Sequence, residues 1–146
     1  MVWPALILEQ RLVGVVPIMI GLAVEWLALW LGGFGLSWKR AALIDIVMNT
    51  VSTVVGILLI PLLGLVWELF PGSLIYPVLK VGTFNPLTWA ATFILAVLAT
   101  TTVEFATVKW GFRIGMNLRW FVVLSAANSV SVAVAFVSLW MHPARL

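Results

Sequence analysis

The chain has 146 residues, of which 64% are hydrophobic and 9% are charged, and its formal net charge is +3. A soluble domain has about 45–50% apolar and about 25% charged residues, and a fold of this size cannot bury so much apolar surface. The chain also lacks cysteine, which excludes disulfides, thiolate metal sites and cysteine nucleophiles. We therefore expect an all-α polytopic membrane protein, and nine tryptophans agree with this, because tryptophan favours the membrane–water interface.

The N-terminal residues, MVWPALILEQR, lack the basic start and the small-residue cleavage site of a signal peptide. We interpret them as mature protein, in which Trp3 and Pro4 begin a short helix at the membrane surface. Four later stretches each reach the roughly 20 apolar residues that a spanning helix needs. These predicted spans cover about residues 12–36, 41–70, 86–108 and 120–141.

Prolines and a long connection interrupt the predicted spans. Pro17 and Pro61 lie inside the first two, and each is expected to kink its helix because proline removes a backbone donor. The second stretch is longer than one span requires, so we expect it to tilt or to protrude beyond Pro61. The connection 71–85 is rich in proline, glycine and aromatic residues, and we expect an irregular segment on the outer membrane face.

The basic residues predict the topology. Five of the eight lie in two turns, 37–40 and 109–119, and they are Lys39, Arg40, Lys109, Arg113 and Arg119. The positive-inside bias places these turns in the cytoplasm and both termini outside. The same side chains are candidates for contact with anionic lipid headgroups, although they can equally serve as ordinary topology charges.

A shift of 79 residues aligns the two halves of the chain without gaps. The matches include polar residues that are rare in this chain and therefore informative. They pair Glu25 with Glu104, Arg40 with Arg119, Asn49 with Asn128 and Ser52 with Ser131. We interpret this as a duplicated helical hairpin within one membrane domain, with repeat 1 at about 12–70 and repeat 2 at about 86–141. An even number of spans per unit makes the repeats parallel, related by an axis along the membrane normal.

The position of the matched residues within each hairpin predicts which side chains meet. Glu25 and Asn49 lie equally far from the turn between their helices, and the same holds for Glu104 and Asn128. At 1.5 Å per residue each lies roughly 18 Å from its turn, near the bilayer midplane, so we expect two Glu–Asn hydrogen bonds. Small and polar neighbours should extend each pair into a stripe that faces the protein interior. These neighbours are Asp45, Ser52, Ser131 and Thr101.

Two interpretations of the glutamates remain open. A charged carboxylate at the bilayer centre costs about 3 kcal/mol, so burial favours the neutral form unless water or a cation is near. The glutamates are either interhelical clamps that fix the register of each hairpin or parts of a proton or cation pathway. A contact with a ligand or pigment is a third, less supported role. Asp45 is interpreted as one member of a structural ion pair, either with Arg40 five residues before it or with a basic residue of the other turn.

Motifs for catalysis and for cofactor binding are missing from the sequence. It contains no Ser–His–acid set, no HExxH, no glycine-rich phosphate loop and no metal-ligand cluster, so we predict no catalytic residue, no metal site and no enzyme. Lipids are the expected ligands. The single histidine, His142, is interpreted as a terminal surface residue, although a pigment or haem contact stays open. Membrane turns explain the net charge, so nucleic acid is not an expected partner.

The leading hypothesis is therefore a non-catalytic accessory or scaffold subunit of a larger membrane complex, such as an energy-transducing (photosynthetic or respiratory) or a transport assembly. Little of the chain lies outside the predicted spans, and aromatic residues mark many helix ends. The alternative is a proton- or cation-coupled transporter or channel that uses Glu25 and Glu104, as a homodimer because four spans leave little room for an enclosed path. Along the chain, an acidic residue is followed by a basic turn and then by Asn-x-x-Ser. This order resembles the pattern of several small bacterial inner-membrane proteins, and we expect the chain to lie in the bacterial inner membrane.

Overall fold

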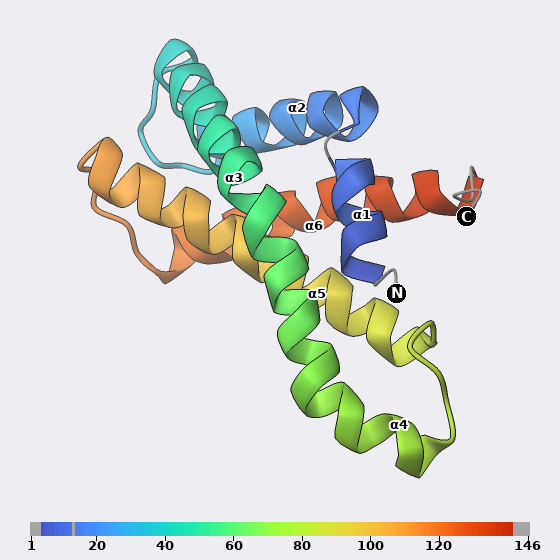
Figure 1. The fold of residues 1–146 in the computed structure, drawn as a ribbon. Coiled ribbons are helices and arrows are strands. Elements are labelled where there is room, and N and C mark those ends of the chain that lie inside the picture. Colours follow the sequence, from blue (N-terminus) through green and yellow to red (C-terminus); the bar gives the residue numbers. More distant parts are fainter. Residues whose placement is uncertain (1–3, 13, 142–146) are drawn as a thin grey trace.

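The computed structural model describes residues 4–12 and 14–141, and in this part every regular element is a helix (Figure 1). The expected all-α class is therefore confirmed. Trp3, His142 and Arg145 lie outside the described residues. The elements are α1 (Pro4–Leu12), α2 (Val15–Leu31), α3 (Trp38–Trp67), the π-helix η1 (Glu68–Gly72), α4 (Ser73–Leu79), α5 (Pro86–Ala106), the π-helix η2 (Thr107–Gly111) and α6 (Leu118–Met141).

Three helical stretches among the described residues are long and apolar enough to cross a membrane. They are Trp38–Leu79, Pro86–Gly111 and Leu118–Leu139. The apolar helix α2, with 17 residues, is shorter. Large apolar side chains such as Leu58 and Trp110 are more than 70% exposed, which suits a chain whose surroundings are apolar.

The first predicted span, 12–36, is not a single helix. The chain leaves the helical conformation at Gly14, whose extended backbone separates α1 from α2. The kink expected at Pro17 is therefore wrong. Pro17 lies in the first turn of α2, where a backbone N–H would have no partner within the helix, so proline costs no hydrogen bond there.

The second predicted span is longer than expected. Helix α3 continues through Pro61, and helical structure then extends through η1 and α4 to Leu79. The expectation of an irregular segment over 71–85 is therefore wrong for most of its length. Lys80 ends α4 in the left-handed conformation with φ 52°, and the side chain of Asn85 then caps the backbone amides at the start of α5.

The four long helices pack so that α3 and α6 each lie against both α2 and α5 (Figure 1). The turns 32–37 and 112–117 lie at one end of this arrangement, which we call the turn end. The short helix α1 packs on α3, α5 and α6 at the other end, which we call the α1 end. A side chain at Gly64 of α3 would collide with Ala5, so this glycine permits the close approach of α1.

An apolar core cluster occupies each end, and polar side chains lie between the two. The cluster at the α1 end includes Leu8, Ile60 and Val132. The cluster at the turn end includes Met48 and Trp120, and the ring of Trp120 stacks on Phe34 with centroids 3.7 Å apart. The polar layer between them contains most of the residues that the sequence singled out.

Candidate functional site

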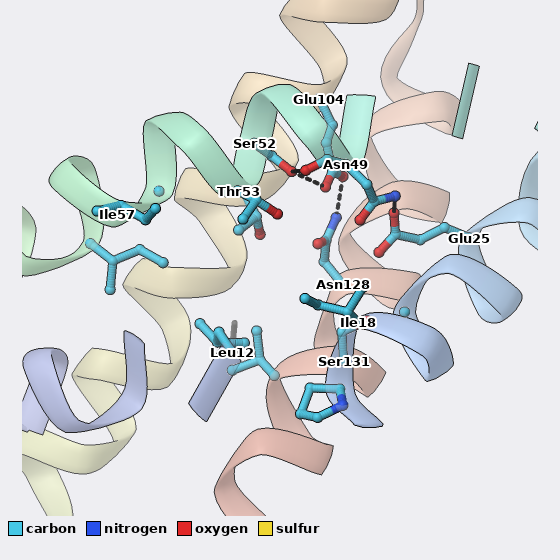
Figure 2. A pocket seen from close by; sticks show the side chains of 16 residues that line it. Leu12, Ile18, Glu25, Asn49, Ser52, Thr53, Ile57, Glu104, Asn128 and Ser131 are labelled. Carbon is cyan, nitrogen blue, oxygen red and sulfur yellow. Dashed lines mark hydrogen bonds between the residues drawn. The ribbon is translucent and has the colours of Figure 1, made fainter. Parts of the chain in front are cut away.

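Helices α2 and α3 bring Glu25 and Asn49 together, as their equal distance from the turn predicted. The Asn49 Nδ2 donates to Glu25 Oε2 at 2.6 Å (Figure 2). Glu25 is 1% exposed, whereas Asn49 is only half-buried. This hydrogen bond joins the two helices of the first hairpin well below the surface.

The second hairpin contains the corresponding contact. The Asn128 Nδ2 of α6 donates to Glu104 Oε2 of α5 at 2.5 Å and to the Leu124 carbonyl at 3.1 Å. Both residues are buried, with 1% of Glu104 and 3% of Asn128 exposed. The structure therefore contains both predicted Glu–Asn contacts, and what they do stays a prediction.

Serine side chains connect each pair to the opposite hairpin. Ser52 Oγ of α3 donates to Glu104 Oε1 of α5 at 3.0 Å (Figure 2). Ser131 of α6 lies near Glu25 of α2: a Cβ added at Gly21 would stand 2.8 Å from Ser131 Oγ and 3.8 Å from Glu25 Oε1. Unlike Ser52, the buried Ser131 hydroxyl has no hydrogen-bond partner among the described residues. The polar layer thus links all four long helices.

Asp45 belongs to this layer and not to the basic turn. Asn49 Nδ2 donates to Asp45 Oδ1 and to the Asp45 carbonyl, both at 3.1 Å, and Asp45 is 2% exposed. No basic side chain of the described residues pairs with it, so the expected ion pair with Arg40 is wrong. Five residues along a helix correspond to roughly 140° of rotation, which directs Arg40 to the surface while Asp45 faces inward.

Thr101 is fully buried one turn before Glu104, and its hydroxyl has no partner among the described residues. The same holds for the Ser125 hydroxyl of α6. A buried hydroxyl without a partner costs roughly 1–3 kcal/mol, which is why such groups usually bind water. The polar layer therefore contains hydroxyl groups that can form hydrogen bonds beyond those present within the described residues.

A cavity of about 70 Å³ reaches this layer (Figure 2). Its polar lining includes both glutamates, both asparagines, Ser52 and Ser131. Because one water needs about 10–15 Å³ of such space, the cavity has room for several waters. Gly21 also lines this cavity, although it was not among the residues predicted from the sequence. The available signal was its position four residues before Glu25, on the same helix face.

The five basic residues of the two turns lie together at the turn end, and all are exposed. Arg119 Nη2 donates to the Gly32 carbonyl at 2.8 Å, and its guanidinium lies over the Phe34 ring. Lys39 and Lys109 lie over neighbouring aromatic rings, at 5.5 Å and 5.9 Å from the centroids of Trp38 and Phe105. Arg40 and Arg113 are likewise exposed there.

No basic side chain of the described residues forms a hydrogen bond or ion pair with Glu25 or Glu104. The described residues also contain no group of acids or histidines suited to a metal ion.

No family model matches this sequence, and neither a curated protein nor a solved structure is significantly similar to it.

Proposed function

We propose that this chain is a proton- or cation-coupled membrane transporter or channel in which Glu25 and Glu104 bind the transported or coupling cation. The observation that carries this proposal is the cavity, because one continuous space borders both glutamates, both asparagines and the serines between them. A pair of purely structural clamps has no need of such a space. Packing it with apolar side chains would stabilise the helices further.

The electrostatics of the layer support a cationic ligand. Three buried carboxyl groups, from Glu25, Asp45 and Glu104, share one hydrogen-bonded cluster with no basic partner among the described residues. Repulsion between like charges and the loss of hydration disfavour ionisation of all three at once. Binding a proton or a small cation relieves both costs, so the free energy of binding depends directly on the charge of this cluster.

We further propose four membrane spans in two parallel hairpin repeats, with α2 as the fourth span. With 17 residues, α2 is about 26 Å long, close to the hydrocarbon thickness of roughly 30 Å. The packing supports the repeat. In two equivalent hairpins, α2 corresponds to α5 and α3 corresponds to α6, so the contact of α2 with α6 should have a counterpart between α5 and α3, and both contacts are present. The exposed basic residues at the turn end favour a cytoplasmic location of that end, and we propose the bacterial inner membrane and a homodimer.

The test is transport by the purified protein in proteoliposomes. We expect a proton or cation flux, and we expect Glu25→Gln and Glu104→Gln each to reduce it at least tenfold, because glutamine keeps the shape but cannot bind a proton or carry charge. Glu68→Gln is the matched control, since Glu68 accepts a hydrogen bond from Tyr76 and does not line the cavity. Its flux should equal that of the wild type. Absence of flux from a folded wild-type protein would reject the proposal.

The second candidate is the accessory or scaffold subunit of a larger membrane complex. A specific observation favours it: an open, mainly apolar groove of about 670 Å³ runs along α2 and α6, bordered by side chains such as Val16, Ile20 and Val137. A helix of another subunit fits such a groove. If the purified protein conducts nothing but is isolated at fixed stoichiometry within a membrane complex, this candidate replaces the transporter.

A further inference from the structure

The cavity that reaches the glutamates extends toward the α1 end of the molecule. On that side it is bordered by Ile18 of α2 and Ile57 of α3, which are 36% and 48% exposed. These residues lie seven and eight positions from Glu25 and Asn49, or roughly 10–12 Å nearer the α1 end. Ile18 is within one turn of the start of α2, so the lining of the cavity extends close to that end of the helix.

The turn end of the same layer is closed by apolar side chains. Leu29, Met48 and Leu124 are fully buried there, and the Trp120 ring, 5% exposed, stacks on Phe34 above them. None of these five residues lines the cavity. A cation that enters from the α1 end therefore meets an apolar barrier after the glutamates.

Asp45 is the exception within this barrier. It lies between Ile44 and Met48 on α3, it is 2% exposed, and it does not line the cavity. One nitrogen, Asn49 Nδ2, donates to Glu25 at 2.6 Å and to Asp45 at 3.1 Å, so the two carboxyls lie side by side across the boundary between cavity and barrier.

The second hairpin has no such group. The position that corresponds to Asp45 is Leu124, which is fully buried in the barrier. Burying a carboxyl group without a cationic partner costs free energy, and a leucine at the same position avoids this cost. The acid in the first hairpin therefore costs stability that the second hairpin shows can be avoided, which points to a role other than packing.

We infer that Asp45 is the third carboxyl of a proton route, which accepts the proton that Glu25 releases and passes it toward the turn end. This inference rests on the proposed function. In the step, the O–H bond of the Glu25 acid breaks and an O–H bond forms on the Asp45 carboxylate, so Glu25 becomes the carboxylate and Asp45 the neutral acid. Asn49 is a positioning residue that holds both groups.

The surroundings of Asp45 are consistent with an exit on that side. On its own helix the residue one turn nearer the turn end is the small Ala41, and Trp38, Lys39 and Arg40 follow at the exposed start of α3. The titratable groups that face Asp45 from other helices are Glu25 of α2 and Glu104 of α5. Helix α6 contributes none at this depth, since its only charged residue among the described ones, Arg119, lies at its start.

The test compares Asp45→Asn and Asp45→Glu with Glu25→Gln in the proteoliposome assay. Asparagine can keep the contact with Asn49 but cannot carry a proton, so we expect Asp45→Asn to lower proton flux at least tenfold while its melting temperature stays close to that of the wild type. Asp45→Glu should restore at least a third of the flux. It should also shift the pH of half-maximal flux, which a merely structural contact would leave unchanged.

The outcomes separate this inference from the proposed function. If the wild type conducts and Glu25→Gln does not, but Asp45→Asn conducts fully, the route avoids Asp45 and only the present inference fails. If the wild type itself does not conduct, the transporter proposal fails and this inference fails with it. If Asp45→Asn does not fold, the pH profile of Asp45→Glu decides, and a profile identical to that of the wild type overturns the inference.

Discussion

The two Glu–Asn pairs occupy corresponding places in their hairpins, but their surroundings differ. In the pair Glu104–Asn128 both residues are buried, and Glu104 also accepts a hydrogen bond from Ser52 of the other hairpin. In the pair Glu25–Asn49 the amide is half-buried, and the hydroxyl of Ser131 lies beside Glu25 without the close hydrogen bond that Ser52 donates to Glu104. A second acid, Asp45, shares the Asn49 amide.

From this difference we expect the two similar contacts to contribute differently to stability and to proton binding. The hydrogen bonds of the pair on α5 and α6 join three helices, which stabilises their packing. The pair on α2 and α3 keeps unused hydrogen-bonding capacity beside an additional carboxyl, which suits a group that changes its protonation state. If both glutamates bind the cation as proposed, we expect Glu25 to change its protonation state more readily and the pair Glu104–Asn128 to contribute more to the stability of the helix packing.

The largest expected effect comes from removing the two amides separately. Asn128→Leu leaves the buried Glu104 without its main donor, and we expect it to lower the free energy of unfolding by about 2 kcal/mol. Asn49→Leu should cost about half as much, because Asn49 is half-buried whereas Asn128 is 3% exposed, so the carboxyl that loses its donor is less completely cut off from water. Reversible unfolding in mixed detergent micelles measures both values. A larger loss for Asn49→Leu would contradict the larger stabilising contribution expected of the pair Glu104–Asn128.

A smaller difference is expected between the two serines. Ser52→Ala removes a hydrogen bond to Glu104 and should lower the free energy of unfolding by about 1 kcal/mol. Ser131→Ala removes a hydroxyl that has no partner among the described residues, and we expect a change within about 0.5 kcal/mol. The same unfolding assay serves as the measurement, and equal losses at both positions would show that Ser131 bonds to Glu25 in the membrane.

The contacts within each hairpin could be predicted from the sequence because they depend on helix geometry alone. Two side chains on antiparallel helices lie at the same level when they are equally far from the turn between the helices. This geometry was sufficient to predict the contact of Glu25 with Asn49 and that of Glu104 with Asn128. The contact of Ser52 with Glu104 could not be predicted in this way. It depends on how one hairpin packs on the other, and no local pattern encodes that arrangement.

The errors at the helix ends have a similar origin. The apolar composition of residues 12–36 was compatible with one long helix, and only the backbone at Gly14 shows the break. Pro61 has no visible effect on the extent of α3, because the helix tolerates the missing donor when its other contacts are retained. For Asp45, spacing in the sequence suggested Arg40 as a partner, but the interior position of the acid, which depends on tertiary packing, selected Asn49 instead.

The smallest expected effect tests the space beside Glu25. A Cβ at Gly21 would lie 2.8 Å from Ser131 Oγ, so Gly21→Ala should crowd this hydroxyl, whereas alanine otherwise stabilises a helix relative to glycine by about 0.5–1 kcal/mol. We expect the double variant Gly21→Ala, Ser131→Ala to be more stable than the sum of the single changes by about 0.5 kcal/mol. Additive changes would mean that the Ser131 side chain turns away from Gly21 at little cost. The position of the Ser131 hydroxyl relative to Glu25 would then be variable. The missing hydrogen bond beside Glu25 would result from rotation of this side chain and not from the way in which the helices pack.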